Sequence, residues 1–226
     1  MKYHGMQYRS VIFDCDGTLI DTLEDIGSAM NQALIQYSFP PLPIEKYRDI
    51  TGWGIFRLAE LALPLDARTG EIIQTLGICA QRIMSEQPAE KYRSKPYPGI
   101  RELLPQLKAK KISIGVLSNK PDPVLRRLMD EFFGRNAFDA LCGLRDGIIP
   151  KPDPSTVWEI LAELGRVPGD TIFLGDSEVD METARNSGCY PLGASWGFRS
   201  RAALESAGAA RIIDTPEEIW KLLNSK

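Results

Sequence analysis

The chain has 226 residues, of which 43% are hydrophobic and 25% are charged, the balance of a folded globular protein rather than a disordered one. Its formal charge of −3 argues against the basic surface that nucleic-acid binding needs and against a polybasic membrane anchor. No stretch approaches the roughly 20 apolar residues of a membrane helix, and no apolar signal core is recognised. We therefore expect a cytoplasmic protein with neither nucleic-acid nor membrane partners.

The cysteines and the histidine narrow the chemistry further. Cys15, Cys79, Cys142 and Cys189 are widely and irregularly spaced, which predicts neither a disulfide framework nor a zinc site. The single histidine, His4, lies close to the N-terminus, so we expect no mechanism that depends on a histidine base.

Short apolar runs that alternate with helical patterns indicate the fold class. The runs are too short for core helices and are rich in Val, Ile, Leu or Phe, as buried parallel strands are. They cover residues 10–13, 112–117, 138–142, 171–174 and 189–194, with helical periodicity at 100–110, 123–133, 155–164 and 178–186. The alternation predicts an α/β fold, a doubly wound parallel sheet of Rossmann type whose strands end at one shared edge.

The segment after the first predicted strand breaks this rhythm. About ninety residues separate that strand from residue 100, far more than one crossover needs. Residues 21–37, 55–63 and 67–87 carry helical periodicity and almost no strand signal, and proline-rich turns punctuate the segment. We interpret residues 21–92 as an α-helical insertion after the first strand, and residues 1–20 and 93–226 as the core.

Two carboxylates follow the first predicted strand directly. Asp14 and Asp16 lie where open α/β sheets bind ligands. One carboxylate can attack an electrophile such as phosphorus, while the other protonates a leaving alkoxide and later activates water. Neighbouring carboxylates repel each other, so a hard cation is expected, and Mg²⁺ fits best. A calcium loop and a plain acidic turn are the alternatives, but Gly17 is at position four rather than six and a strand precedes it.

Polar residues after the second and third predicted strands could complete a phosphate site. Ser118 and Asn119 offer a hydroxyl and an amide beside the start of the next helix, although Ser-Asn is equally an ordinary helix cap. Lys151 stands among three prolines that fix the backbone, and its ammonium group could balance charge on a nucleophile and on phosphoryl oxygens. Taken alone, Lys151 is more simply a solvated loop lysine.

A second pair of acids follows the fourth predicted strand. Asp176 and Asp180 are four residues apart and can share one face at the start of a helix. Acids there also complement the helix dipole, which is the purely structural explanation. As metal ligands, they would complete the cation site that Asp14 and Asp16 require.

Together these segments resemble the haloacid dehalogenase superfamily of phosphohydrolases, over the whole chain. The motifs that carry the resemblance are Asp-x-Asp-Gly-Thr-Leu from Asp14, Ser118-Asn119, the isolated Lys151, and Gly-Asp-Ser-x-x-Asp at 175–180. The resemblance implies that Asp14 is the nucleophile that forms an aspartyl-phosphate. It implies that Asp16 is the general acid and base and also binds the metal through its carbonyl oxygen.

The remaining roles follow from the same resemblance. Gly17 and Thr18 would belong to a substrate-side flap that moves with the cap. Ser118 would hydrogen-bond the phosphoryl group with help from Asn119, and Lys151 would neutralise charge. Asp176 and Asp180 would bind Mg²⁺, Asp176 directly and Asp180 directly or through water. The helical insertion matches the position of the cap in this family, with hinges expected at 17–22 and 93–98.

Two departures favour a phosphatase over a phosphomutase of the β-phosphoglucomutase type. The fourth motif has Gly175 and a later Asp180 where those mutases have Glu-Asp-Ser without the later acid. The cap stretch 51–57 also lacks the Ser-Arg pair of the mutases. Residues 195–199 and 212–218 resemble the phosphoglycolate phosphatase branch. A phosphomutase, a pyrophosphatase and a non-catalytic binding module remain alternatives.

We therefore expect a Mg²⁺-dependent hydrolase of a small phosphorylated metabolite, similar to phosphoglycolate phosphatase. A carboxylated substrate would need a cation from the cap, and the candidates are Arg57, Arg48 and Lys46, although a position on a solvated helix face is the simpler explanation for each. Trp53 lies between two glycines and could face substrate or pack between cap and core. The oligomeric state stays open.

Overall fold

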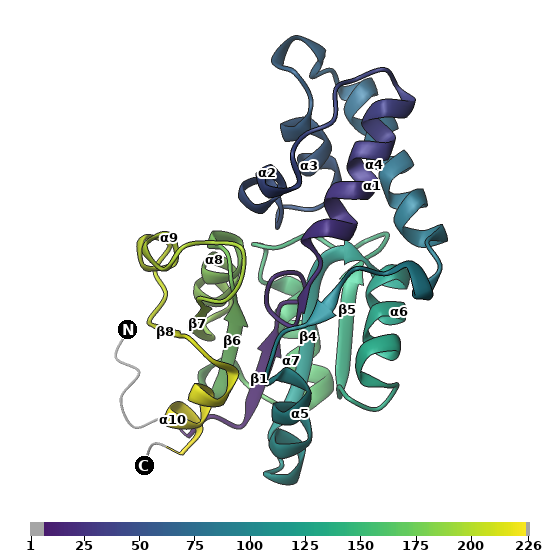
Figure 1. Cartoon of the computed structure of the whole chain (residues 1–226). Helices are drawn as coiled ribbons and strands as arrows, with labels where there is room; N and C mark the ends of the chain where they lie inside the picture. Colours follow the sequence, from purple (N-terminus) through teal and green to yellow (C-terminus); the bar gives the residue numbers. More distant parts are fainter. Residues whose placement is uncertain (1–6, 225–226) are drawn as a thin grey trace.

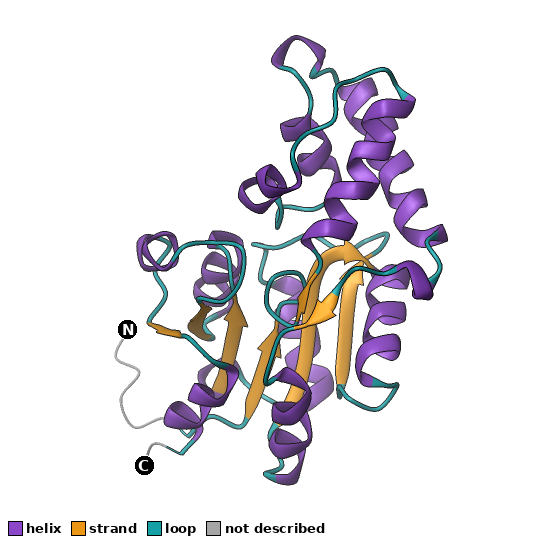
Figure 2. Ribbon diagram, viewed as in Figure 1, coloured by secondary structure: helices purple, strands orange, loops and turns teal. Residues whose placement is uncertain are grey.

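The structure is a computed structural model that describes residues 7–224, so His4 lies outside the described residues. Its centre is a six-stranded sheet in which each adjacent pair of strands is parallel (Figures 1 and 2). From edge to edge the strands are β5 (Ala140–Leu144), β4 (Ser113–Pro121), β1 (Ser10–Phe13), β6 (Thr171–Gly175), β7 (Tyr190–Ala194) and β8 (Arg211–Ile213). The doubly wound parallel sheet expected from the sequence is confirmed.

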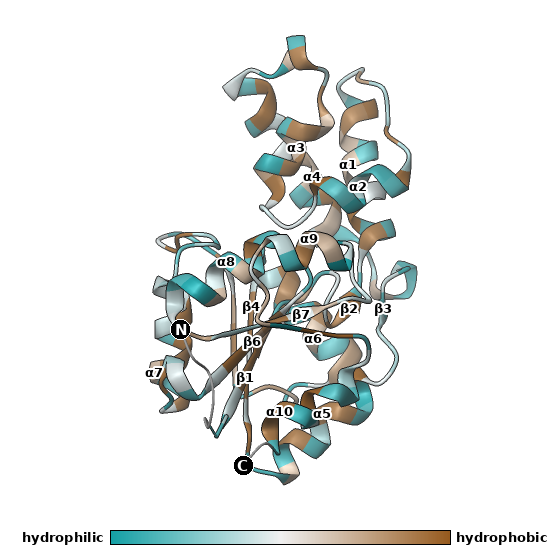
Figure 3. Cartoon of the chain, turned by 90° about the vertical axis from the view of Figure 1, so that its left-hand side faces the viewer, coloured by the Kyte–Doolittle hydropathy of each residue, from teal (hydrophilic) through white to brown (hydrophobic). Residues whose placement is uncertain are grey.

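Helices cover both faces of the sheet because alternate residues of each strand point to opposite sides. Val11 and Phe13 of β1 pack in one apolar cluster with α5 (Ile100–Ala109), α6 (Asp122–Phe133) and α10 (Trp220–Leu223). Ile12, between them, packs in a second cluster with α7 (Ser155–Leu164) and α8 (Glu178–Ser187). In Figure 3 the central strands are mostly brown, whereas the surrounding helices carry teal segments.

Four α-helices form the upper part of the molecule in Figure 1 and lie apart from the sheet. They are α1 (Leu23–Gln36), α2 (Ile44–Ile50), α3 (Ile55–Ala62) and α4 (Gly70–Glu86), with short 3-10 turns at Leu65–Ala67 and Ala89–Lys91. Their buried side chains form an apolar cluster of their own, which Phe198 of the lower part joins. These helices lie within the segment 21–92 that the sequence pattern singled out.

A two-stranded antiparallel ribbon lies where the chain leaves the sheet and returns to it. β2 (Ile20–Asp21) pairs with β3 (Lys95–Pro96), so that Ile20 is opposite Pro96 and Asp21 is opposite Lys95. Asp25 in the first turn of α1 strengthens this junction, because its carboxylate accepts hydrogen bonds from the backbone amides of Arg93 and Ser94. The two connecting segments are therefore tied to each other.

The structure also differs from the predicted elements in several places. β4 runs to Pro121, four residues beyond the predicted end at residue 117, so Ser118 and Asn119 belong to the strand; α6 follows directly from Asp122, one residue before its predicted start. The sequence pattern gave no signal for α2, β2, β3, β8, α9 (Arg201–Ser206) or α10. Within residues 7–224, no helix is long and apolar enough to cross a membrane.

Candidate active site

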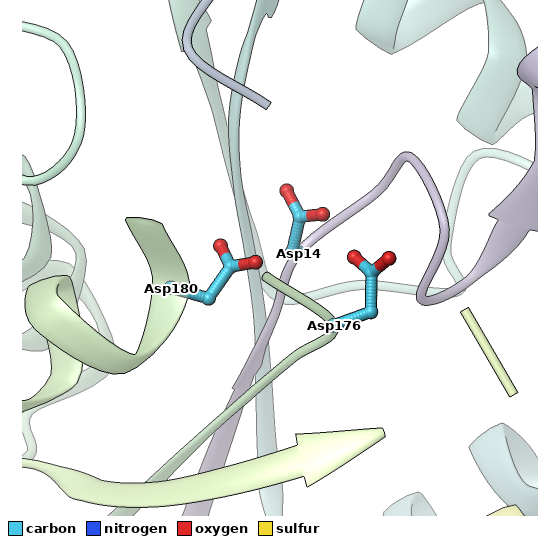
Figure 4. Close-up of side chains that lie close together, drawn as sticks. All are labelled: Asp14, Asp176 and Asp180. Carbon is cyan, nitrogen blue, oxygen red and sulfur yellow. The ribbon is translucent and has the colours of Figure 1, made fainter. Parts of the chain in front are cut away.

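Three carboxylates meet at the carboxyl ends of the central strands (Figure 4). Asp14 follows β1, Asp176 follows β6, and Asp180 lies in the first turn of α8. One oxygen from each lies within 4.8 Å of the others, and all three residues are buried. Topology brings them together, because parallel strands β1 and β6 are neighbours and end at the same edge.

The negative charge of the three carboxylates exceeds the positive charge that neighbouring residues supply. Burial raises the pKa of Asp14 well above its usual range, and the Asp180 carboxylate raises it further, while Lys151 opposes the shift. Burial, together with Asp180, raises the pKa of Asp176 to about 7. Such shifts arise where charged oxygens lack water and sufficient counter-charge. The donor set, hard carboxylate oxygens in a small space, fits a divalent cation.

Lys151 supplies the positive charge inside this cluster. Its Nζ lies 2.6 Å from Asp14 Oδ1 and 2.7 Å from Asp180 Oδ1, and the side chain is only 3% exposed. Burial lowers the pKa of Lys151, but the two carboxylates outweigh burial and leave the pKa above its ordinary value. The structure therefore places Lys151 in the site rather than in a solvated loop.

Asn119 holds the backbone that carries this lysine. Its Oδ1 accepts a hydrogen bond of 2.8 Å from the Lys151 amide, and its Nδ2 donates to the Lys151 carbonyl at 3.1 Å. The same Nδ2 lies 3.1 Å from the carbonyl oxygen of Gly52, in the loop between α2 and α3. The amide of Asn119 thus joins three segments that are distant in sequence.

Asp16 lies apart from the three-carboxylate cluster. Its Oδ1 accepts a hydrogen bond of 2.6 Å from Thr22 Oγ1 and lies 3.1 Å from Lys120 Nζ. Lys120 is 7% exposed; burial lowers its pKa, but the charge and hydrogen bond of Asp16, together with Cys15 and Asp25, raise the pKa above its ordinary value overall. The side chain of Asp16 is therefore separate from the cluster of Asp14, Asp176 and Asp180, and its own charged partner is Lys120.

A small cavity of about 50 Å³ lies between the sheet edge and the upper helices. From the sheet side it is lined by Asp14, Asp16 and residues 118–121, and from the helical side by Ile26, Thr51, Gly52, Gly54, Ile55, Leu58 and Met84. Ser118 is 2% exposed, and its Oγ accepts a hydrogen bond from the Lys120 amide. Among the described residues that line this cavity, Lys120 is the one that carries positive charge.

The loop after Asp16 packs directly on Asp176. Gly17 has φ of +88°, and a Cβ on it would overlap the Asp176 carboxylate. The Thr18 hydroxyl donates to Asp176 Oδ1 at 3.3 Å. Neither residue lines the cavity; instead Gly17 leaves room for the Asp176 carboxylate, and Thr18 hydrogen-bonds to it.

The expected cap cations are not brought to the cavity. Arg57 forms an ion pair of 2.6 Å with Glu60 on the surface of α3 and does not line the cavity. Arg48 donates to the carbonyl oxygen of Gly197 at 2.9 Å. Trp53 donates to Glu178 Oε1 at 3.4 Å and so bridges the two parts of the molecule.

Sequence reasoning did not assign Lys120 or Arg199, the two buried cations beside the site. Lys120 immediately follows the Ser118-Asn119 motif, but its contact with Asp16 depends on the fold. Arg199 is 9% exposed and lies in the stretch 195–199, which was singled out only for its resemblance to one branch of the superfamily. For both residues, the signal that the sequence offered was a basic residue within or directly after a stretch that had already been singled out.

Comparisons with known proteins identify the family of this chain. The sequence profile of the haloacid dehalogenase-like hydrolases matches residues 11–194, which contain every clustered carboxylate. The chain belongs to this family. A phosphoglycolate phosphatase of Caulobacter vibrioides is 31% identical over 98% of this chain and 95% of its own length. A phosphoglycolate phosphatase of Pseudomonas putida is 27% identical over 94% of this chain and 78% of its own length.

Solved structures with the same fold superpose closely on this chain. A crystal structure from Lactobacillus delbrueckii subsp. bulgaricus superposes with a TM-score of 0.89 and 30% identity, covering 96% of this chain and 99% of its own. A structure from Clostridium acetobutylicum superposes with a TM-score of 0.86 at 23% identity, covering 97% and 99%. The haloacid dehalogenase-like chain described here thus falls in the phosphoglycolate phosphatase-like branch of phosphohydrolases.

Proposed function

We propose that this enzyme is a Mg²⁺-dependent phosphatase that hydrolyses a small, phosphoglycolate-like phosphate monoester through an aspartyl-phosphate on Asp14. The observation that carries the proposal is the buried cluster of Asp14, Asp176 and Asp180 around Lys151, with Asp16 beside the same cavity. Curated relatives that are 27% and 31% identical to this chain are named phosphoglycolate phosphatase.

In the first step, a carboxylate oxygen of Asp14 attacks the phosphorus atom, and the bond from phosphorus to the alcohol oxygen breaks. Asp16, in its protonated form, donates its proton to the leaving oxygen, so the alcohol departs neutral. Ser118 lines the same cavity as Asp14, and Lys151 contacts Asp14, so both would hold phosphoryl oxygens, and Lys151 would balance charge as it shifts from Asp14 to the phosphoryl group.

In the second step, Asp16 takes a proton from water while the water oxygen attacks phosphorus. The bond between phosphorus and the Asp14 oxygen breaks, which releases inorganic phosphate and restores both carboxyl groups to their starting states. The side chains of Asp14, Asp176 and Asp180 would hold the metal, with the Asp16 carbonyl by family resemblance. Bound there, Mg²⁺ would supply positive charge that lowers repulsion between the nucleophile and the phosphate.

Lys120 is the feature that favours a carboxylated leaving group. The helical wall of the cavity is lined largely by apolar side chains, and the cap cations Arg57 and Arg48 are engaged elsewhere. Lys120 lines the same cavity from the sheet side. We propose that its ammonium group pairs with the carboxylate of the leaving glycolate-like alcohol as well as with Asp16.

We also propose that residues 21–92 act as a cap over a core of residues 1–20 and 93–226. Support comes from the separate apolar cluster of the upper helices and from the cavity that they share with the sheet edge. In the cycle, the cap would exclude water while the aspartyl-phosphate forms and would open to release product.

Phosphate release from phosphoglycolate, sugar phosphates, nucleotides and pyrophosphate tests the function. We expect release from a small monoester with Mg²⁺, none with EDTA, and none from the Asp14→Asn variant. Unchanged release by that variant would remove Asp14 as the nucleophile. Conversion of a sugar 1-phosphate to the 6-phosphate without net phosphate release would instead identify a phosphomutase, and preference for pyrophosphate would identify a pyrophosphatase.

A further inference from the structure

Arg199 joins the two parts of the molecule through one buried side chain. It lies in the loop after β7, and its Nη2 donates to the carbonyl oxygen of Thr51 at 2.7 Å. Its Nη1 contacts the carbonyl oxygen of Arg48. Its Nε lies 2.9 Å from Glu178 Oε2, and Nη2 lies 3.2 Å from Glu178 Oε1. The guanidinium group therefore touches the end of α2 on one side and the start of α8 on the other.

The C-terminal end of α2 and the carboxylate of Glu178 are both suitable partners for a guanidinium group. Arg48 and Thr51 lie at the C-terminal end of α2, where helix carbonyls lack amide partners and the helix dipole favours a positive charge. Glu178 supplies the counter-charge, and a planar guanidinium group can serve both ends at once with its fixed fork of donors. A lysine at this position would keep the charge but could not make the same set of bonds.

The bonds of Arg199 reach both halves of the active site. Glu178 lies between Asp176 and Asp180, so it belongs to the segment that carries two of the three clustered carboxylates. Thr51, on the other side, lines the cavity together with Gly52 and Gly54 of the same loop. One arginine thus ties the cavity loop, through the Thr51 carbonyl, to the segment of the clustered carboxylates, through Glu178.

A second arginine makes the reverse contact across the same junction. Arg48 of α2 donates to the carbonyl oxygen of Gly197 at 2.9 Å, and its guanidinium carbon lies 5.8 Å from the centre of the Phe198 ring. Arg199 of the sheet part contacts the Arg48 carbonyl in return. Trp53 adds a third link, through its 3.4 Å contact with Glu178. These three links lie together around the C-terminal end of α2 and the loop after it, whereas Arg127 of α6 makes a separate set of hydrogen bonds to the carbonyl oxygens at the end of α4.

We propose that Arg199 is a positioning residue that holds the loop 51–54 against the core when the cap is closed, with Glu178 as its counter-ion. The bonds from Arg199 to Thr51 and Arg48 form on closing and break on opening, while the bonds to Glu178 persist. An effect of Arg199 on turnover rests on the proposed phosphatase function, whereas the role of Arg199 in holding the loop 51–54 is independent of that function.

Two measurements on Arg199→Gln test the proposal, with Arg201→Gln as a matched control. Arg201 is two residues away and forms an ion pair with Asp214. We expect R199Q to raise KM for the phosphate ester at least tenfold with a smaller change in kcat, because the closed form becomes less populated. We also expect amide hydrogen exchange at residues 51–56 to speed up at least tenfold in R199Q, and neither effect in R201Q.

Two further variants cover the case in which R199Q does not fold. Arg199→Lys keeps the charge without the fork, and Glu178→Gln removes the counter-ion, so each should shift KM and exchange in the same direction. Unchanged exchange at 51–56 in the folded variants would overturn the proposal, as would a loss confined to kcat. Exchange is measurable without any substrate, so a failure to find phosphatase activity leaves this test intact.

Discussion

The ammonium nitrogen of Lys151 lies 2.6 Å from Asp14 Oδ1 in a region that water hardly reaches. The contact places a fixed positive charge against the proposed nucleophile. It also explains how a buried carboxylate, whose pKa burial raises well above its usual range, can share the site with two others.

The first prediction concerns the charge of Lys151. Lys151→Met should lower kcat/KM about 100- to 1000-fold, the usual cost of losing one fixed donor to a developing anion. Lys151→Arg should also lose activity, because the larger planar group does not fit between Asp14 and Asp180. Steady-state kinetics check this against Lys110→Met, an exposed lysine at the end of α5. Activity of K151M within threefold of the control would remove Lys151 from the proposed chemistry.

The second prediction separates two possible roles of Lys120. If its ammonium group binds the carboxylate of the leaving alcohol, Lys120→Met should lose about 10- to 100-fold more kcat/KM on phosphoglycolate than on ethyl phosphate, the value of one desolvated charged contact. If Lys120 acts only by holding Asp16, 3.1 Å away, both substrates should lose equally. An equal loss would therefore contradict the carboxylate contact, and the ratio of the two kcat/KM values decides the matter.

The third prediction concerns the close approach of Gly17 to Asp176. Gly17→Ala adds a methyl group that overlaps the Asp176 carboxylate, so that carboxylate must move and activity should fall at least tenfold. Gly134→Ala is the matched control, because its φ of +83° is nearly the same but nothing lies within 4 Å of the added carbon. Both variants should lose about 1 kcal/mol of unfolding free energy from the positive φ. Full activity of G17A, measured beside G134A, would show that the position of Asp176 tolerates this shift.

The fourth prediction is a pH dependence of stability at Asp122, at the start of α6. Burial alone would raise the pKa of Asp122, but hydrogen bonds from Arg126 and from the Gly143 amide, with the charges of Arg126 and Arg145, hold it below its usual value. Its stabilising contribution should therefore be fully present above the unfolded-state pKa of about 3.9. It should fade as the pH falls through the lower folded-state pKa.

Urea unfolding of Asp122→Asn across pH 2.5–7 measures this contribution. The variant should be less stable than the original chain by on the order of 1 kcal/mol at neutral pH, and the difference should shrink at the acid end. Asp66→Asn, at an exposed position in the upper helices, serves as the control. A difference that grows on acidification would contradict the sign of the Asp122 shift.

The parts of the structure that could be predicted are those with a local signature. The strand before Asp14 is a run of apolar residues buried on both faces, and such runs give the sheet and the edge where its ligands lie. β4 was predicted too short because its last residues, 118–121, are polar or proline, and they stay extended through pairing of Pro121 with Leu144. β2 and β3 have two residues each, too few for any periodic pattern.

The contacts of charged side chains were the least predictable part of the site. The candidate cap cations were inferred from charge alone, and the structure uses Arg48 on the Gly197 carbonyl and Arg57 on Glu60. Lys120 gains its place beside Asp16 only because β1 and β4 are neighbours in the sheet. Such partners depend on strand order, which a sequence pattern does not specify.

The pairing of β2 with β3 has a consequence for how the sequence of this chain can change in evolution. Since Ile20 lies opposite Pro96, the 75 residues between them leave the sheet part and rejoin it at one place. With respect to the sheet, this whole stretch is one long loop whose ends are paired through β2 and β3. Lengthening such a loop adds little to the entropic cost of closing it. Such a loop can be shortened, enlarged or exchanged for another fold while the register of β1 and its neighbours stays the same. An ancestor could thus acquire a new substrate range by replacing this one loop, with its carboxylates left untouched.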